Sequence, residues 1–258
     1  HGLFVSADGP QNRCVCFVHS HRIGRNFADH AKELNNAVPT EPFFFLKPTS
    51  SYIGSGDAIE IPRGVVAHHE GRCMAYGSGA GRDPRAKSAR YQGIAGQRLH
   101  RWLRYVDSIH SALAIDMTAR NVQDKAKKAG LPWSTAKGFD TFTPISTFVP
   151  KDAIADPSNV NLWLKVNDEL RQNGNTQDMI FDIPALLAHV SSIMTLDVGD
   201  VILTGTLLLL TQGTPKGVSQ INPGDHVTAG MQLPGSSKIL AELKLRAMQR
   251  EGGFVFQG

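Results

Sequence analysis

The stretch AHHEGR at positions 67–72 places two histidines and a glutamate at the end of an apolar run. Imidazole nitrogens and carboxylate oxygens are common protein ligands of divalent metal ions. Because neighbouring side chains of a strand point to opposite faces, His68, His69 and Glu70 cannot all bind one ion. The residue types therefore indicate a divalent-metal site to which this stretch supplies only some of the ligands.

Other polar residues are ambiguous when only their type and spacing are considered. His30 and Glu33 lie three positions apart in a predicted helix, so they share a face as either a general base with its carboxylate partner or a surface pair. Asp116 ends a predicted apolar strand, where an aspartate commonly caps the next helix. Lys137, in STAKGFDTF, would by its residue type alone be expected to lie in solvent. These patterns support nothing more specific than a divalent-metal site with oxygen ligands.

The elements that position these residues are predicted from hydrophobic periodicity and turn residues. Helices are predicted in 24–37 and 118–133, and a third is capped by Asp182 with Pro184 in its first turn. The second carries Val122 and Ala126 on one side and is stopped by Gly130 and Pro132. A buried strand is predicted in 41–52, and further strands in 58–66, 113–116, 160–172, 199–206, 221–231 and 238–248. The segment 160–172 is a hairpin that turns at Asn167 and Asp168. Many strands with a few helices between them predict an α+β fold with a β-rich core.

Longer sequence words are more specific than single residues. The chain contains, in this order, GRNFADHAKE, EPFFFLKPTSSY, HHE, AIDMTARNVQDKAKKAGLPWSTAKGFDTFTPIS, LWLKVNDELRQNGNTQDMIFDI, GDVILTGT and PKGV. This series resembles the fumarylacetoacetate hydrolase family, and most of all its small acylpyruvase and oxaloacetate decarboxylase branch. The resemblance covers most of residues 23–70 and 112–250.

The resemblance implies a fold, an assembly and a cofactor. The expected fold is α+β, a β-rich mixed β-sandwich roll of the type found in the C-terminal domain of this family. Residues 1–22 would be an irregular N-terminal segment, and residues 23–258 a single catalytic domain. The expected assembly is a homodimer, the cofactor Mg²⁺ or Mn²⁺, and the substrate a small 2-oxoacid.

The resemblance also implies which side chains bind the metal. The family's metal carboxylates fall on Glu70, on a second glutamate two positions later, and on Asp116. Position 72 is Arg72 here, so one carboxylate of the family pattern is missing. The family's oxyanion-stabilising lysine falls on Lys137.

The remaining site residues are an acid–base pair and a group that binds the substrate. The family's acid–base pair falls on His30 and Glu33. A hydrogen bond from the histidine to the glutamate would make the imidazole a stronger base toward water. The candidates to hold the substrate's carboxylate are Arg120, Gln123, Thr206 and Thr214.

The expected reaction is metal-dependent hydrolysis of a carbon–carbon bond in acylpyruvates, or decarboxylation of oxaloacetate to pyruvate. Both reactions produce the enolate of pyruvate, which a divalent ion stabilises as a Lewis acid. An alternative within the same family is an oxoacid tautomerase or isomerase, which needs the enolate but no attacking water. A second alternative is a catalytically defective product, because one metal carboxylate is missing. A third is a basic binding module.

Residues 71–111 depart from the family pattern. They hold eight basic and two acidic residues, a net charge of +6. A reading frame shifted by one base through 79–93 and 99–104 gives family-like words, which indicates a frame error flanked by retained intron pieces, GRCMAYGS and YVDSIHS. A similar insert, GTLLLLTQ, interrupts the family's LTGTPKGV string near 206–213. We expect 71–111 not to order itself, and the chain to be insoluble or protease-sensitive there.

Composition narrows the class of protein. With 258 residues, 41% of them hydrophobic, the chain can bury a full core. No apolar run approaches the roughly 18–20 residues that cross a bilayer, and residues 1–13 lack the layout of a secretory signal. Residues 71–111 carry +6 and the rest of the chain −2, so all the excess basic charge lies in a tract without an amphipathic helix or an aromatic-rich strand to present it to a phosphate backbone. Nucleic acid is therefore not expected as a partner, and neither is a membrane. Three cysteines without a CxxC pair favour reducing conditions, in the mitochondrial matrix or cytoplasm.

Overall fold

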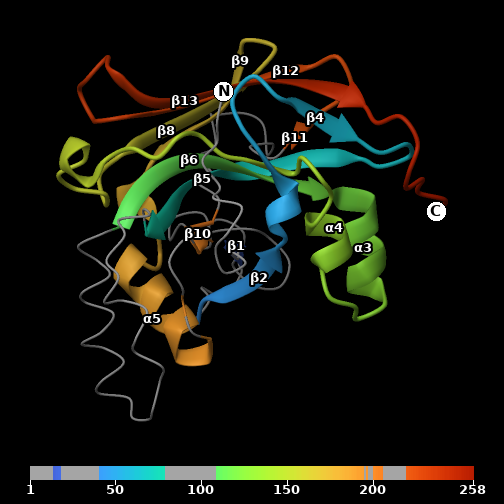
Figure 1. Ribbon diagram of the computed structural model, residues 1–258, viewed down its shortest axis with the longest axis horizontal. Coiled ribbons are helices and arrows are strands. Elements are labelled where there is room, and N and C mark those ends of the chain that lie inside the picture. The colour runs from blue at the N-terminus through green and yellow to red at the C-terminus, as the bar shows by residue number, and fades with distance from the viewer. Residues whose placement is uncertain (1–13, 19–40, 79–108, 195, 197–199, 206–218) are drawn as a thin grey trace, which may run out of the picture.

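A computed structural model describes residues 14–18, 41–78, 109–194, 196, 200–205 and 219–258, and these residues form two large sheets and a short strand pair (Figure 1). The larger sheet joins β1 (Cys14–Val18), β2 (Phe43–Lys47), β5 (Ala67–Ser78), β6 (Ile109–Ala119), β10 (Val201–Leu203) and β11 (Ser219–Gln220). The second sheet joins β4 (Ala58–Ile61), β8 (Asn161–Val166), β9 (Glu169–Asn175), β12 (His226–Gln232) and β13 (Ile239–Gln249). The short pair is β3 (Tyr52–Ile53) with β7 (Thr143–Pro144).

The larger sheet is rolled, so that its strands form two layers. Its strand order is β11-β5-β10-β1-β2, and β6 also pairs with β5. Ala112 and Ala114 of β6 pack in one cluster with Phe45 of β2 and Leu203 of β10. One face of β6 therefore packs against β10 and β2, which belong to the same sheet. In Figure 1, β5 and β6 form the middle layer and β1, β2 and β10 lie below them.

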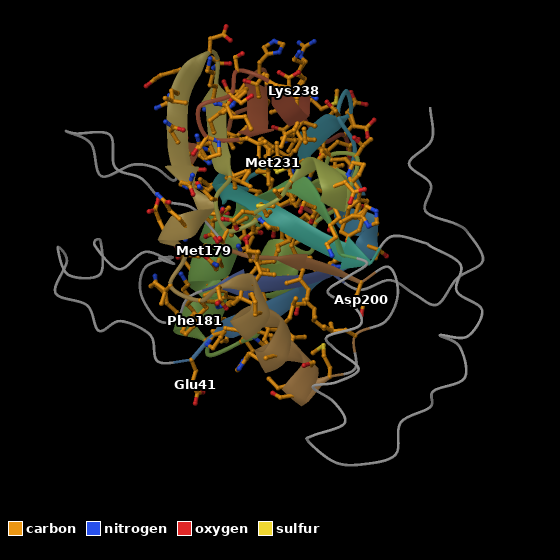
Figure 2. All side chains as sticks on the ribbon, turned by 90° about the vertical axis from the view of Figure 1, so that its left-hand side faces the viewer. Glu41, Met179, Phe181, Asp200, Met231 and Lys238 are labelled. Carbon is orange, nitrogen blue, oxygen red and sulfur yellow. The ribbon has the colours of Figure 1, made fainter. Side chains whose placement is uncertain are left out.

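The second sheet covers the opposite face of β6. Leu113, Ile115 and Met117 are fully buried in a cluster with residues of β4, β8, β12 and β13. Figure 2 shows Met231 of β12, also fully buried, between the second sheet and the middle layer. Alternate residues of β6 thus belong to two different cores, as the two-residue period of a strand requires.

These layers confirm the expected α+β class and the β-rich sandwich roll. Pairing is mixed, because β1 with β10 and β13 with β4 run parallel while β5 with β6 and β12 with β13 run antiparallel. The β8–β9 hairpin turns at Asn167 and Asp168, as predicted, with φ values of 51° and 64°. Positive φ at both central positions is the requirement of a type I′ turn, which asparagine and aspartate tolerate well.

Two of the three predicted helices are present, one within 118–133 and one after Asp182. Helix α3 (Arg120–Lys128) buries Val122, Gln123 and Ala126 and ends before Gly130, whose φ is 65°. Helix α5 (Ile183–Ile193) is capped by Asp182, whose Oδ1 accepts from the Ala185 N–H at 2.8 Å. One-turn 3₁₀ segments cover Thr49–Ser51, Lys151–Ala153 and Thr176–Asp178. The helix predicted in 24–37 lies outside the described residues.

Three local expectations are wrong. Asp116 does not cap a helix, because β6 continues through Ala119 and the N-cap of α3 is Ala119, without a side-chain cap bond. The strand in 41–52 is not buried throughout, since Phe43 is 41% exposed. Residues 71–78 and 109–111 are ordered, because β5 and β6 pair from Ala67 opposite Ala119 to Ser78 opposite Ile109.

The ends of the basic tract therefore contribute to the middle layer, where Met74 is fully buried. Residues 71–78 pair with β6 along their whole length, so their backbone N–H and C=O groups form hydrogen bonds that an isolated segment would lack. Residues 79–108 and 206–218 lie outside the described residues, so the frame error and the insert stay predictions. The transcript sequence across codons 70–112 would decide the first. Among the described helices, none has the length and apolar character to cross a bilayer.

Candidate active site

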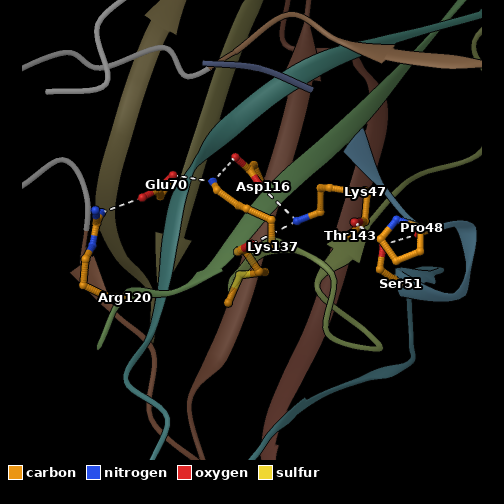
Figure 3. A network of polar contacts seen from close by, with 9 residues as sticks. Lys47, Pro48, Ser51, Glu70, Asp116, Arg120, Lys137 and Thr143 are labelled. Atoms are coloured by element: carbon orange, nitrogen blue, oxygen red, sulfur yellow. Dashed lines mark hydrogen bonds and ion pairs between the residues drawn. The ribbon is translucent and has the colours of Figure 1, made fainter. Parts of the chain in front are cut away.

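The amino group of Lys137 lies between two carboxylates from neighbouring strands (Figure 3). Its Nζ donates to Asp116 Oδ2 at 2.6 Å, and to Glu70 Oε2 in a second ion pair. The Lys137 side chain is fully buried, whereas the side chains of Asp116 and Glu70 are 10% and 12% exposed. The structure thus brings together three residues that the family resemblance selected from positions far apart in the chain.

A β-bulge places Glu70 at this point. The pairing of β5 with β6 shifts between His69 and Gly71, so Glu70 is the extra residue and has no partner of its own on β6. A bulge bends the strand and changes where the extra side chain points. The residue that directly opposes Asp116 is Gly71, which adds no side chain there. The carboxylate of Glu70 can therefore reach the same ammonium as Asp116.

Lys47, which sequence reasoning missed, binds the other oxygen of the same aspartate. Its Nζ donates to Asp116 Oδ1 at 2.9 Å and to the Met117 carbonyl at 3.0 Å, and its side chain is fully buried. Along β2, Phe45 and Lys47 are buried while Leu46 between them is 42% exposed. The two-residue period of the strand was the available signal, because a lysine on the buried face needs an acidic partner.

The turn after Lys47 ties β2 to the elements that carry the other site residues. Ser51 Oγ donates to the Pro48 carbonyl at 2.6 Å and lies 2.7 Å from Thr143 Oγ1 (Figure 3). The short helix α4 (Ser134–Lys137) ends at Gly138. A Cβ at Gly138 would lie 2.7 Å from the Ser134 carbonyl oxygen and 3.2 Å from Pro48 Cδ, so the glycine allows both the end of α4 and its approach to this turn. That approach places Lys137 beside Lys47 in the roll.

Helix α3 adds a guanidinium to the site. Arg120 Nη2 pairs with Glu70 Oε1 at 2.7 Å, and its Nη1 donates to Gln123 Oε1 at 2.8 Å. Gln123 is 1% exposed, whereas the Arg120 side chain is 28% exposed. Arg120 and Gln123, both candidates for holding the substrate's carboxylate, are thus in contact with each other and next to the carboxylate pair.

The charges in the site shift the pKa of each buried group. Burial would raise the pKa of Asp116 and Glu70, but nearby Lys137, with Lys47 or Arg120, holds both below their ordinary values. Burial would lower the pKa of Lys137, but the two carboxylates hold it above its ordinary value. All three groups are therefore ionised at neutral pH. With Lys47 and Arg120 the five groups carry three positive and two negative charges, a net charge of +1.

Lys137 uses most of its hydrogen-bonding capacity within the protein in this arrangement. An ammonium group has three N–H donors. Two of them go to Glu70 and Asp116, and the ring of Phe45 lies 4.6 Å from Nζ, at the distance of a cation–π contact. Arg120 differs, because two of its five N–H donors are used by Glu70 and Gln123, and the other three have no partner among the described residues.

The donor set fits a divalent cation such as Mg²⁺, which proteins often hold with one or two carboxylates while waters and substrate complete the shell. Glu70 and Asp116 both face the Lys137 ammonium, so a cation bound by both carboxylates would take the place that this ammonium occupies. Within the described ranges no group of three or more His, Cys, Asp or Glu gathers, so these two carboxylates would be the protein's contribution. Arg72, which stands where the resemblance implies a further glutamate, pairs in register with Ile115 and not with Asp116.

Two histidines precede Glu70 on β5. His69 is fully buried and its Nε2 lies 2.7 Å from Ser219 Oγ on β11. His68 is half-buried beside Arg120, Glu70 and Asp124, and burial followed by the Arg120 charge lowers its pKa. The imidazole of His68 is therefore neutral at pH 7.

Four of the expected site residues cannot be placed. His30 and Glu33, the expected acid–base pair, lie outside the described residues, as do Thr206 and Thr214, two candidates for binding the substrate's carboxylate. Their roles stay predictions.

Comparisons with known proteins agree with the resemblance seen in the sequence. A family model described as "Fumarylacetoacetate (FAA) hydrolase C-terminal" matches residues 20–96 and 105–242. The rice protein named "Oxaloacetate tautomerase FAHD1, mitochondrial" is 49% identical over 214 residues, covering 81% of this chain and 83% of its own length. The Dictyostelium discoideum protein named "Oxaloacetate decarboxylase, mitochondrial" is 47% identical over 211 residues, covering 81% and 86%. The crystal structure of a yeast fumarylacetoacetate hydrolase family protein aligns with a TM-score of 0.69 at 33% identity, over 95% of this chain and 96% of its own.

Proposed function

Because this chain belongs to the fumarylacetoacetate hydrolase C-terminal family, we propose that it is an enzyme of oxaloacetate that interconverts the keto and enol forms at the site around Glu70, Asp116 and Lys137. The names of the rice relatives and of an Arabidopsis thaliana relative, which is 46% identical, support this reaction. The observation that carries the proposal is the pair of buried carboxylates that face one cationic position, with a partly exposed arginine beside them.

Keto–enol interconversion passes through an enolate, so the site must stabilise negative charge on the oxygen at carbon 2. The five charged groups have a net charge of +1, and burial strengthens their field because the dielectric constant is low there. Lys137 contributes to this positive field and fixes the two carboxylates with two of its three N–H donors. Arg120 is the group that can contact a substrate carboxylate directly, with three unused N–H donors.

Glu70 and Asp116 are the residues that would hold Mg²⁺ or Mn²⁺. When bound, the ion supplies Lewis-acid stabilisation of the 2-oxo group. Lys47 binds Asp116 through Oδ1 and keeps the carboxylate ionised, as a ligand must be, while Oδ2, which accepts from Lys137, is the oxygen that would face the ion. The role of the two lysines in this proposal is to position the ligand.

Decarboxylation of oxaloacetate to pyruvate is a second candidate, supported by the name of the Dictyostelium relative. It generates the same type of enolate, so the same charged groups would serve it. Hydrolysis of acylpyruvates is a further activity within this proposal, and it depends on His30 as the base and Glu33 as its partner.

The proposal extends to the protein's setting. The substrate is a small 2-oxoacid, the assembly a homodimer, and the compartment the mitochondrial matrix. The rice, Arabidopsis and Dictyostelium relatives are all named mitochondrial, which supports the last of these. Sedimentation velocity of the purified chain would test the dimer, and a monomer at micromolar concentration would contradict it.

The test of function follows the enol form of oxaloacetate by ultraviolet absorbance and pyruvate formation by a coupled assay. Each is measured with Mg²⁺, with Mn²⁺ and after chelation. We expect the chain to accelerate enol-to-keto conversion, and Lys137→Met to lose at least about a hundredfold of the rate. Lys238→Met removes an exposed lysine at the far end of the second sheet and is the matched control (Figure 2). A folded chain that accelerates neither reaction would overturn the proposal and favour a catalytically defective product.

A further inference from the structure

Two buried polar atoms beside the charged site have no hydrogen-bond partner among the described residues. They are Nδ1 of His68 and Oγ1 of Thr118, and the Thr118 side chain is fully buried. Leaving a buried polar group unpaired is costly, so such atoms in a native protein call for an explanation. A ligand that pairs with both atoms provides one.

The two atoms are close to each other and to the site. His68 on β5 and Thr118 on β6 are directly opposite in register, so their side chains share a face of the sheet. Thr118 lies two residues after Asp116 on the same strand and therefore on the same face as that carboxylate. His68 lies two residues before Glu70 on β5.

The chemistry of this pair suits a carboxylate oxygen. A threonine hydroxyl donates one hydrogen bond, and an imidazole ring donates from a ring nitrogen that carries a hydrogen. The guanidinium of Arg120, with three unused N–H donors, adds a positive charge beside them. An anionic acceptor would satisfy the hydroxyl, the imidazole in its Nδ1–H tautomer, and the guanidinium at the same time.

We propose that His68 and Thr118, together with Arg120, bind the carboxylate of the substrate that is remote from its 2-oxo group, and so select dicarboxylic over monocarboxylic 2-oxoacids. Two residues along a strand span about 6.7 Å, which is the separation expected between the Cα atoms of Thr118 and Asp116. The 2-oxo group and its adjacent carboxylate lie at Asp116, and the second carboxylate reaches toward α3. This inference rests on the proposed function and names the part of the substrate that each residue binds.

The test compares two substrates of the same reaction, oxaloacetate and acetylpyruvate, which has a methyl ketone in place of the second carboxylate. Thr118→Val removes the hydroxyl at nearly constant shape, and Thr118→Ser is the matched variant that keeps it. His68→Phe removes both ring nitrogens, and His68→Asn keeps an amide group near the place of Nδ1. The readout is kcat/KM for enol-to-keto conversion of oxaloacetate divided by that for acetylpyruvate.

We expect this ratio to fall at least about tenfold in Thr118→Val and in His68→Phe, the loss of one charge-assisted hydrogen bond in each case. Thr118→Ser and His68→Asn should lie closer to the unchanged chain than the variants they match. A ratio that does not change, or equal losses on both substrates, would overturn the inference and leave the proposed function standing. An unchanged chain that is inert toward both substrates would overturn the proposed function, and the inference with it.

A stability measurement separates binding from a structural role. If the Thr118 hydroxyl has no partner in the free protein, Thr118→Val should leave the midpoint of thermal unfolding unchanged or raise it. A lower midpoint in Thr118→Val, but not in Thr118→Ser, would show that the hydroxyl is bonded within the protein, which contradicts the inference.

Discussion

Lys47 and Asp116 are 69 positions apart in the chain and form a buried ion pair with 2.9 Å between Nζ and Oδ1. The pair joins β2 to β6 across the interior of the rolled sheet. Because Lys137 binds the other oxygen of the same carboxylate, Asp116 is held from two sides. The orientation of this aspartate is therefore set by the fold before any substrate or metal binds.

Replacing Lys47 should destabilise the fold as well as the site. Lys47→Met removes the buried cation and leaves Asp116 with one partner, which should lower the free energy of unfolding by about 3–5 kcal/mol. Urea denaturation at pH 7 measures this. The exposed control Lys238→Met should change it by less than about 0.5 kcal/mol. Equal values for the two variants would show that the buried pair contributes nothing to stability.

Replacing Lys137 should destabilise the protein most at neutral pH. The pKa values of Glu70 and Asp116 are held below their ordinary values of 4.5 and 3.8, so their contribution is present above that range and is lost as the pH falls below it. Lys137→Met removes the largest favourable charge, and burial should then raise both pKa values. Protonation at lower pH would remove the unpaired charges from the variant.

The stability difference between the unchanged chain and Lys137→Met should therefore shrink as the pH falls from 7 toward about 4.5. Chemical denaturation at several pH values measures it. A difference that stays constant over this range would mean that the carboxylates do not become uncompensated when Lys137 is removed.

Binding of Mg²⁺ should depend on both carboxylates. Glu70→Gln and Asp116→Asn should each weaken the affinity at least about tenfold, because each removes one of two charged ligands. Isothermal titration calorimetry of the chain without substrate measures this. Glu242→Gln, which alters a carboxylate on β13 paired with Lys244, is the control and should leave the affinity unchanged. Binding that persists in both site variants would place the ion elsewhere.

His30 and Glu33 should act as one unit if they are the acid–base pair of acylpyruvate hydrolysis. His30→Ala and Glu33→Ala should each remove most of this activity, and the double variant should lose little more than either single variant. The hydrolysis rate of acetylpyruvate in the three variants measures this. Losses that multiply would instead indicate independent roles.

The sequence by itself determined the local elements of this protein and the family to which it belongs. The β8–β9 turn, the cap of α5 and the inner face of α3 follow from residues within a few positions of one another, where short-range geometry decides the conformation. The long sequence words identified the family and, through it, Glu70, Asp116 and Lys137. None of these steps needed to know which strands are neighbours.

Only the tertiary structure decided how these residues meet. A bulge in the pairing of β5 with β6 places Glu70, and no residue pattern within β5 predicts that shift. Residue type alone predicts that Lys137 lies in solvent, yet its side chain is fully buried between two carboxylates. Lys47, also fully buried, was not recognised as a site residue at all. The physical reason is that the cost of burying a charge depends on partners distant in the chain, and those partners are fixed only when the sheet rolls and α4 packs against β2.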